Sequence, residues 1–197
     1  MLRRSGPEHL RQLVLICLVA TGLQQLASAA LVKAKAHMAP VLIERAWSHS
    51  LANGGVPQKP WSWADTWPVG RLRVPAEGVD QLVLSGDSGN ALAFGPGHSV
   101  ASAPLGGPGL TVIGGHRDTH FRFLSRLQSG ANLNLQTLDG QWRHYRVIGS
   151  EIVDSRLRMA QTSEEESLQL VTCYPFDSLD AGGPLRYVVT ARPVFDL

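Results

Sequence analysis

The chain holds two cysteines, and only Cys173 lies beyond the apolar segment near the N-terminus. It closes the strand-like run 167–173, and Tyr174-Pro175 ends that strand because proline cannot donate to a sheet hydrogen-bond ladder. The thiol is therefore expected at a strand end, where a substrate can reach it. A reachable thiol can serve as the nucleophile of acyl transfer through a thioester. Burial as a small hydrophobic residue stays open as the alternative for Cys173 taken alone.

An imidazole that could assist the thiol stands in a glycine turn, Gly114-Gly115-His116-Arg117-Asp118-Thr119-His120. A thiol nucleophile needs such a group to form the thiolate and to protonate the leaving amine. The glycines before His116 allow close backbone approach and tight turning, which makes it a candidate, although spacing alone favours neither His116 nor His120 strongly. His120, four residues later, is the strongest alternative, and His98 and His144 also stay open.

A guanidinium on the next strand-like run, 185–190, completes the set of groups that acyl transfer requires. Arg186 near the start of this run could hold the substrate backbone or the developing oxyanion. An arginine in a strand can equally point into solvent. Arg117, Arg143 and Arg146 are the alternatives among the arginines.

Short strands must position these three residues. From Gly70 onward, runs rich in Val, Leu, Ile and Tyr alternate with turn residues, which predicts a mainly β domain built as a small closed barrel or sandwich. Asp139-Gly140 between two such runs indicates a hairpin. Short helical pieces are expected at 90–94 and 119–127. The predicted strands are 71–74, 82–85, 110–114, 133–137, 143–153, 168–172 and 186–192.

The N-terminus predicts export. An uncharged stretch from Leu13 to Val32 has the length of a bilayer-spanning helix, and Arg3, Arg4 and Arg11 precede it. This charge order places the C-terminal part outside the cytoplasm. Ala27-Ser28-Ala29 has the form of a signal-peptidase site, so a cleaved signal peptide is the alternative. We favour an uncleaved anchor because the apolar helical pattern continues past that site.

We accordingly divide the chain into an N-terminal signal anchor (1–35), a stalk helix with a Trp/Pro-rich segment (36–69) and a catalytic domain (70–197). A helix over 33–52 is expected to end at Asn53-Gly54-Gly55. The tryptophans after it either pack against the domain or lie at a membrane interface.

Composition narrows the class of protein. The 44% apolar and 17% charged residues argue against a disordered chain. A net charge of +2 gives no support to nucleic-acid binding, so no nucleic-acid partner is expected.

The chemistry-bearing residues also carry a family resemblance. Leu170-Val171-Thr172-Cys173 resembles the Thr-x-Thr-Cys or Leu-x-Thr-Cys signature of the sortases, which are cysteine transpeptidases. Gly115-His116-Arg117 is similar to their Gly-His-Arg segment, and Arg186 lies on the strand after the cysteine, as in that family. The resemblance runs from about Gly70 to the C-terminus. Segments that look most like the Gram-negative class of sortases are 61–68, 94–98, 116–121 and 172–176.

This resemblance implies an eight-stranded sortase β-barrel with short helices, preceded by an N-terminal transmembrane signal anchor. It implies Cys173 as the nucleophile, His116 as the general acid and base, and Arg186 as the residue that positions the oxyanion and the substrate. It also selects His116 over His120, because His116 follows the glycine. Thr172 and His120 are expected to contact the substrate.

The implied reaction is cleavage of a C-terminal sorting signal of Leu-Pro-x-Thr-Gly type between Thr and Gly, followed by transfer of the Cys173-bound acyl group to an amine. The implied partners are a substrate protein with that signal, an amine nucleophile, and the inner membrane, with the catalytic domain on the periplasmic side. A thiol protease that hydrolyses the same thioester is one alternative. A non-catalytic membrane-anchored β-module is the other.

Acidic residues before the cysteine strand raise the question of a metal. Some family members bind calcium through acidic loop residues there, and Glu164-Glu165-Glu166 is a candidate for such a site. A solvated acidic turn is the simpler interpretation, because calcium would need oxygen ligands from other loops too. No metal and no cofactor are expected.

Overall fold

A computed structural model describes residues 7–87, 89–157, 165–178 and 182–194. Arg3, Arg4 and Glu164 lie outside the described residues. By its internal contacts the chain separates into two compact units, 1–41 and 42–197. The boundaries predicted at residues 35 and 69 stay predictions.

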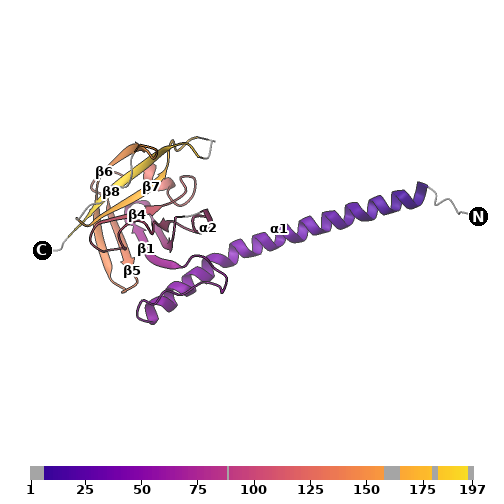
Figure 1. Cartoon of the computed structure of the whole chain (residues 1–197), viewed down its shortest axis with the longest axis horizontal. Helices are drawn as coiled ribbons and strands as arrows, with labels where there is room; N and C mark the ends of the chain where they lie inside the picture. The colour runs from indigo at the N-terminus through magenta and orange to yellow at the C-terminus, as the bar shows by residue number, and fades with distance from the viewer. Residues whose placement is uncertain (1–6, 88, 158–164, 179–181, 195–197) are drawn as a thin grey trace, which may run out of the picture. The chain divides into compact units, whose positions relative to one another are not determined.

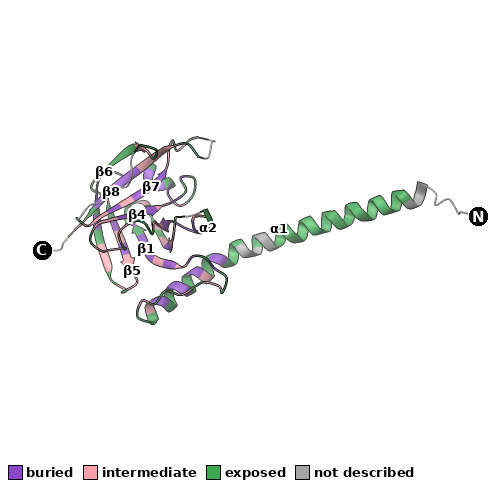
Figure 2. Cartoon of the chain, viewed as in Figure 1, coloured by how far each residue is buried: buried purple, intermediate pink, exposed green. Residues whose placement is uncertain are grey.

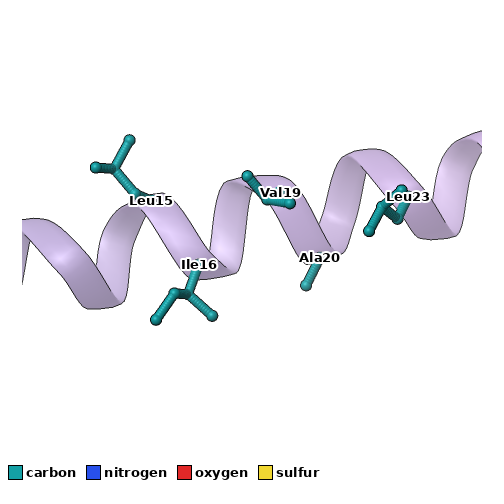
Figure 3. Close-up of a pocket in the computed structure, with 5 residues that line it drawn as sticks. All are labelled: Leu15, Ile16, Val19, Ala20 and Leu23. Atoms are coloured by element: carbon teal, nitrogen blue, oxygen red, sulfur yellow. The ribbon is translucent and has the colours of Figure 1, made fainter.

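The first unit carries an apolar helical stretch. Helix α1 (Pro7–Ala52) contains a 21-residue span, Leu10–Ala30, with a mean hydropathy of 1.8 and no buried residue. Figure 2 shows this stretch as exposed, and Figure 3 shows apolar side chains projecting from it, namely Leu15, Ile16, Val19, Ala20 and Leu23. Such a helix is long and apolar enough to cross a bilayer and is compatible with a single-pass anchor. A signal sequence would share these properties.

The last turns of α1 belong to the second unit and bury one face. Ile43, Ala46, Trp47 and Ser50 are buried, at the spacing expected of an amphipathic helix. The helix ends at Ala52, which confirms the end predicted at the Asn-Gly-Gly sequence.

The Trp/Pro-rich segment after α1 also belongs to this unit. Trp61 packs against Ile43, Leu84 and Ala91, and its ring meets Phe94 edge-on at 5.6 Å between centroids. Packing against the domain is therefore confirmed for Trp61. Trp63, in contrast, is 80% exposed.

Eight strands close into a barrel, in the order β1-β2-β3-β4-β7-β8-β6-β5. Figure 1 labels the longer strands of this barrel. The mainly β barrel with short helices is confirmed. Strand β3 was not predicted, because two residues carry no alternating pattern. The strands are β1 (Pro68–Val74), β2 (Val79–Ser85), β3 (Gly97–His98), β4 (Leu110–Gly114), β5 (Asn132–Thr137), β6 (Trp142–Asp154), β7 (Ser167–Cys173) and β8 (Leu185–Pro193). The short helices are η1 (Pro75–Glu77), α2 (Gly89–Leu92) and η2 (Arg122–Ser125).

The alternation of the strands fills the barrel. Along β7 and β4 every second residue is buried, which is the period expected when one face of a strand meets the core. The largest fully buried side chains include Leu72, Ile113, Phe121, Tyr145 and Leu170. The interior is thus packed with side chains, and the reactive groups must lie on its outside or at its ends.

The hairpin predicted at Asp139-Gly140 joins β5 to β6. Gly140 has φ +79°, and the Asp139 carboxylate accepts hydrogen bonds from the Thr137 hydroxyl and the Gln141 amide. The glycine supplies the left-handed conformation that the turn requires.

Candidate active site

Strand register places Cys173 beside Arg186. Cys173 is the last residue of β7, and its Cα partner on the antiparallel strand β8 is Arg186. Directly opposite residues of an antiparallel pair point to the same face of the sheet. The inward face of β7 is taken by Leu168, Leu170 and Thr172, which are all buried. The thiol and the guanidinium, both half-buried, therefore share the outer face at this end of the barrel.

Strand β4 leads His116 to the same end. It runs parallel to β7, with Gly114 opposite Val171, so both strands finish at one edge of the sheet. The amide of Gly115 donates to the Val171 carbonyl at 3.1 Å, and Thr172 Oγ1 donates to the Gly115 carbonyl at 2.7 Å. His116 follows at once and is exposed. Gly115, directly before His116, is thus hydrogen-bonded to Val171 and Thr172, the two residues before Cys173.

Gly115 has to be a glycine because of its neighbour. A Cβ atom at this position would lie 2.8 Å from the ring of Phe121, a fully buried residue that packs edge-on against Phe123. The same atom at Gly114 would meet nothing closer than 3.9 Å. The close approach inferred from the glycine turn therefore belongs to the second glycine.

The two histidines of the turn differ in environment. His116 is exposed, and its carbonyl accepts a hydrogen bond from the Phe121 amide at 2.9 Å. His120 is half-buried, and its carbonyl accepts one from Gln81 Nε2 at 3.2 Å. Burial, together with repulsion from His116, lowers the pKa of His120 below its ordinary value. The lowered pKa favours the neutral form of the His120 ring.

The His116 side chain is exposed and that of Cys173 is half-buried. Within the described part of the chain, neither the ring of His116 nor Sγ of Cys173 makes a hydrogen bond, and none joins the two. Catalytic hydrogen bonds are often long or absent before substrate binds, so this arrangement is consistent with a resting enzyme.

Arg186 is held by its own strand end. Its Nη1 donates to the carbonyls of Gly183 and Leu185, at 2.5 and 2.9 Å. A guanidinium has five N–H donors, and no other side-chain bond of Arg186 forms among the described residues. Nε and Nη2 are thus available for a substrate oxygen. Hydrogen bonds from Arg156 lower the pKa of Asp154 to about 2, and the charge of Arg186 adds to this effect.

The alternative histidines and arginines on other strands are engaged elsewhere. His98 on β3 contacts the Ala103 carbonyl at 2.9 Å, and His144 on β6 contacts Asn134 Oδ1 at 2.8 Å. Arg143 pairs with Asp139 in the hairpin. Arg146 is exposed at the end of the β6–β8 pairing away from Arg186.

Thr172 faces inward. It is 2% exposed, and its hydroxyl bonds to Gly115 as described above. Its predicted contact with substrate stays a prediction, but the hydroxyl clearly connects β7 to the turn before His116.

The described part of the acidic run is engaged with other side chains. Glu166 accepts a hydrogen bond from the Tyr145 hydroxyl at 2.6 Å, and Glu165 pairs with Arg192 at 3.4 Å. Among the described residues, no group of three His, Cys, Asp or Glu side chains gathers as a metal site would require.

Two features of this end could not be read from the sequence. Arg117, considered only as an alternative to Arg186, is buried and binds the segment that follows Cys173. The rings of Tyr174, Phe176 and Tyr187 also cluster there, with centroids 5.2 to 6.3 Å apart. The Gly-His-Arg motif names Arg117 as a neighbour of the imidazole but carries no signal of its burial.

A closed eight-stranded barrel with a cysteine, an imidazole and a guanidinium at one end defines a class of proteins, and comparisons identify it. Residues 72–194 match the family model of the Sortase domain. The chain belongs to the sortase family, as the sequence motifs predicted. The narrower resemblance to the Gram-negative class stays a prediction.

Individual relatives agree with this assignment. Sortase D from Bacillus subtilis (strain 168) is 33% identical over 127 residues, which are 64% of this chain and 63% of the relative. The match therefore spans less than two thirds of that relative. The catalytic domain of B. anthracis SrtD is 31% identical, with a TM-score of 0.54, over 65% of this chain and 88% of that one. A Clostridium perfringens Sortase D5 transpeptidase, 19% identical, shares the fold with a TM-score of 0.61 over 81% of this chain and 98% of that one.

Proposed function

We propose that this protein is a cysteine transpeptidase that cleaves a C-terminal sorting signal and joins the released carbonyl to an amine. One observation carries the proposal: three strand ends meet at one edge of the barrel. Strand β7 ends on Cys173, Arg186 stands opposite it as the second residue of β8, and β4 leads through Gly115 to His116. Membership in the sortase family supports the same activity.

The proposed reaction has two halves. Sγ of Cys173 attacks the carbonyl carbon of the Thr–Gly bond in a Leu-Pro-x-Thr-Gly-type signal, and the thiol proton passes to His116. The C–N bond then breaks as His116 gives that proton to the departing amine, which leaves a thioester on Cys173. An incoming amine attacks the thioester, its proton returns through His116, and the C–S bond breaks to restore the thiol.

Arg186 is proposed to bind the substrate carbonyl oxygen as it becomes an oxyanion. The guanidinium lies on the same face as the thiol, and its Nε and Nη2 are available as donors. A fixed cation at a developing negative charge typically contributes about 100- to 1,000-fold to the rate.

His116 is proposed as the proton carrier in preference to His120. It is exposed next to the strand end that carries the thiol, whereas His120 is half-buried with a lowered pKa. A group that must hold a proton for the leaving amine at neutral pH should not be pushed toward its neutral form. His120 is proposed instead to contact the substrate, together with the backbone of Thr172, whose side chain faces inward.

The apolar span of α1 is proposed to anchor the chain in the inner membrane, with the catalytic domain on the periplasmic side. The 21-residue length supports this, because about 20 apolar residues cross a bilayer as a helix. The substrate would then be a protein that carries its sorting signal on that side of the membrane.

The test uses the full chain in detergent micelles and a Leu-Pro-x-Thr-Gly peptide, with and without a glycine oligopeptide as the amine. A transpeptidase gives a ligated product that grows with amine concentration. A thiol protease gives only the hydrolysed peptide at every amine concentration. If neither product forms and Cys173 is inert to thiol-specific electrophiles at neutral pH, the protein is a non-catalytic module and the proposal fails.

A further inference from the structure

A buried charge lies directly beside the proposed general acid. Arg117 is 6% exposed, and its neighbour in the chain is His116. A buried guanidinium is costly unless its N–H groups are hydrogen-bonded. Nη1 donates to the Pro175 carbonyl at 2.9 Å and Nη2 to the Ser178 carbonyl at 2.6 Å, while Nε lies 3.4 Å from Asp118 Oδ1. The two contacts to the backbone carbonyls are shorter than the contact to Asp118, whose carboxylate is largely exposed.

The two carbonyls belong to the segment that follows the proposed nucleophile. Pro175 and Ser178 are two and five residues after Cys173, but 58 and 61 residues after Arg117. A single side chain thus connects the loop after the imidazole with the loop after the thiol. No strand lies in the described parts of either loop, and the ring of Phe176 also packs against the core.

We infer that Arg117 is a positioning residue for the proposed pair of Cys173 and His116. Its guanidinium holds the segment after the thiol against the turn that carries the imidazole. On the other side of His116, Gly115 is hydrogen-bonded to Val171 and Thr172. The residue before His116 therefore binds the residues before Cys173, and the residue after His116 binds the segment after Cys173. The inference rests on the proposed function.

The geometry requires an arginine in particular. Its planar fork can donate to two carbonyls from two nitrogens at once, whereas a lysine offers one nitrogen on a flexible stem. Arg117→Lys therefore keeps the positive charge and removes the double connection. A displacement of about 1 Å between reacting groups can cost roughly 100-fold in rate.

The experiment compares Arg117→Lys with the parent as full chains in detergent micelles, using the sorting-signal peptide and amine described above. We expect kcat to fall by roughly 10- to 100-fold per folded molecule, with KM within threefold of the parent. Arg126→Lys is the matched control. Arg126 also makes two hydrogen bonds, both to Glu77, but it is 60% exposed and its partner lies on η1. Its kcat should stay within twofold of the parent.

A second readout separates positioning from stability and does not need the peptide. The rate of Cys173 alkylation by iodoacetamide is measured against pH, and the folded fraction is measured by circular dichroism. We expect the dependence of the Cys173 alkylation rate on pH to differ between Arg117→Lys and the parent. The folded fraction at about room temperature should be the same for both. A variant with a lower Tm but the parent's kcat and alkylation profile would overturn the inference.

The outcomes distinguish this inference from the proposed function. A parent that forms no acyl-enzyme contradicts the proposed function itself. A parent that is active beside an equally active Arg117→Lys contradicts only the role of Arg117. If Arg117→Lys does not fold, Arg117→Gln, which keeps two N–H donors, takes its place in the same assay. If neither folds, Arg117 serves the fold alone and the inference is overturned.

Discussion

The arginines in two regions of the barrel have different hydrogen-bond partners. On one surface, which we call the ion-pair face, Glu44, Arg71, Arg73, Asp80 and Trp142 contact one another. Arg71 binds both carboxylates, and Arg73 binds Asp80 at 2.9 Å while lying 4.5 Å from the centre of the Trp142 ring. On this face each charge meets an opposite charge or a π-face.

At the candidate active site the shortest described contacts of the arginines are to backbone carbonyls, although Arg117 also lies 3.4 Å from Asp118 Oδ1. Arg117 donates to carbonyls after the thiol, and Arg186 donates to the carbonyls of Gly183 and Leu185 at the start of its own strand. The thiol and the ring of His116 are left without hydrogen bonds among the described residues. The difference teaches that the side chains proposed to react are positioned through hydrogen bonds of the backbone around them. Side chains that only stabilise the surface bind each other.

The largest effect should come from His116→Ala. Removal of a general acid and base typically costs roughly 100- to 10,000-fold, so turnover of the sorting peptide should fall into the background. His120→Ala is the matched control, because it removes an imidazole from the same turn; some loss of peptide affinity is expected and the chemical step should remain. Full activity in His116→Ala with loss in His120→Ala would mean that the other imidazole carries the proton.

Gly115→Ala should reduce both activity and stability. The added Cβ collides with the ring of Phe121, and overpacking of this kind costs about 1–3 kcal/mol. Because His116 follows directly, the turn should shift and kcat should drop at least roughly tenfold. Gly114→Ala, whose Cβ has room, should leave both properties near the parent. Equal behaviour of the two variants would show that the contact with Phe121 does not position the turn.

Asp80→Asn should act on stability alone. It removes the carboxylate that binds Arg71 and Arg73, and partly exposed ion pairs contribute about 0.2–1 kcal/mol. Burial tends to raise the pKa of Asp80, but its hydrogen bonds from Arg71 and Arg73 outweigh this and lower it. Denaturant unfolding should show a small loss of stability with unchanged kcat. A loss of kcat of more than threefold per folded molecule would link the ion-pair face to catalysis, and the two regions would then not differ in role.

The smallest expected effect is on the stability of the fold at mildly acidic pH, through the protonation of His120. The folded-state pKa of His120 lies below its ordinary value of 6.5, so the unfolded chain binds a proton that the folded chain resists. Stability should therefore decrease as the pH falls through 6.5 toward the lower folded-state value. His120→Gln should flatten this part of the curve of unfolding free energy against pH. An unchanged slope in the variant would show that His120 is not the group responsible.

Much of this architecture follows from local sequence patterns. Runs rich in Val, Leu, Ile and Tyr between turn residues predicted the longer strands, and Asp139-Gly140 predicted the hairpin, because each depends on a few neighbouring residues. The motifs around Cys173 and His116 predicted the family.

What the sequence could not supply was long-range pairing. The register that sets Cys173 opposite Arg186 depends on how two strands align. The contact from Arg117 to Pro175 spans 58 residues, and no local pattern marks a partner at that distance. Strand β3, with two residues, is defined by its neighbours and not by its own composition.

The central claim is that Cys173 forms a thioester with a sorting-signal peptide. Its most direct test is intact-mass analysis of the full chain after brief incubation with a Leu-Pro-x-Thr-Gly peptide and no added amine. The account predicts a mass increase equal to the acyl part of the peptide, mapped to Cys173, released by hydroxylamine and absent in Cys173→Ala. Two results would contradict this claim. In one, the parent chain is alkylated at Cys173 but never gains this mass; in the other, Cys173→Ala gains the mass to the same extent as the parent.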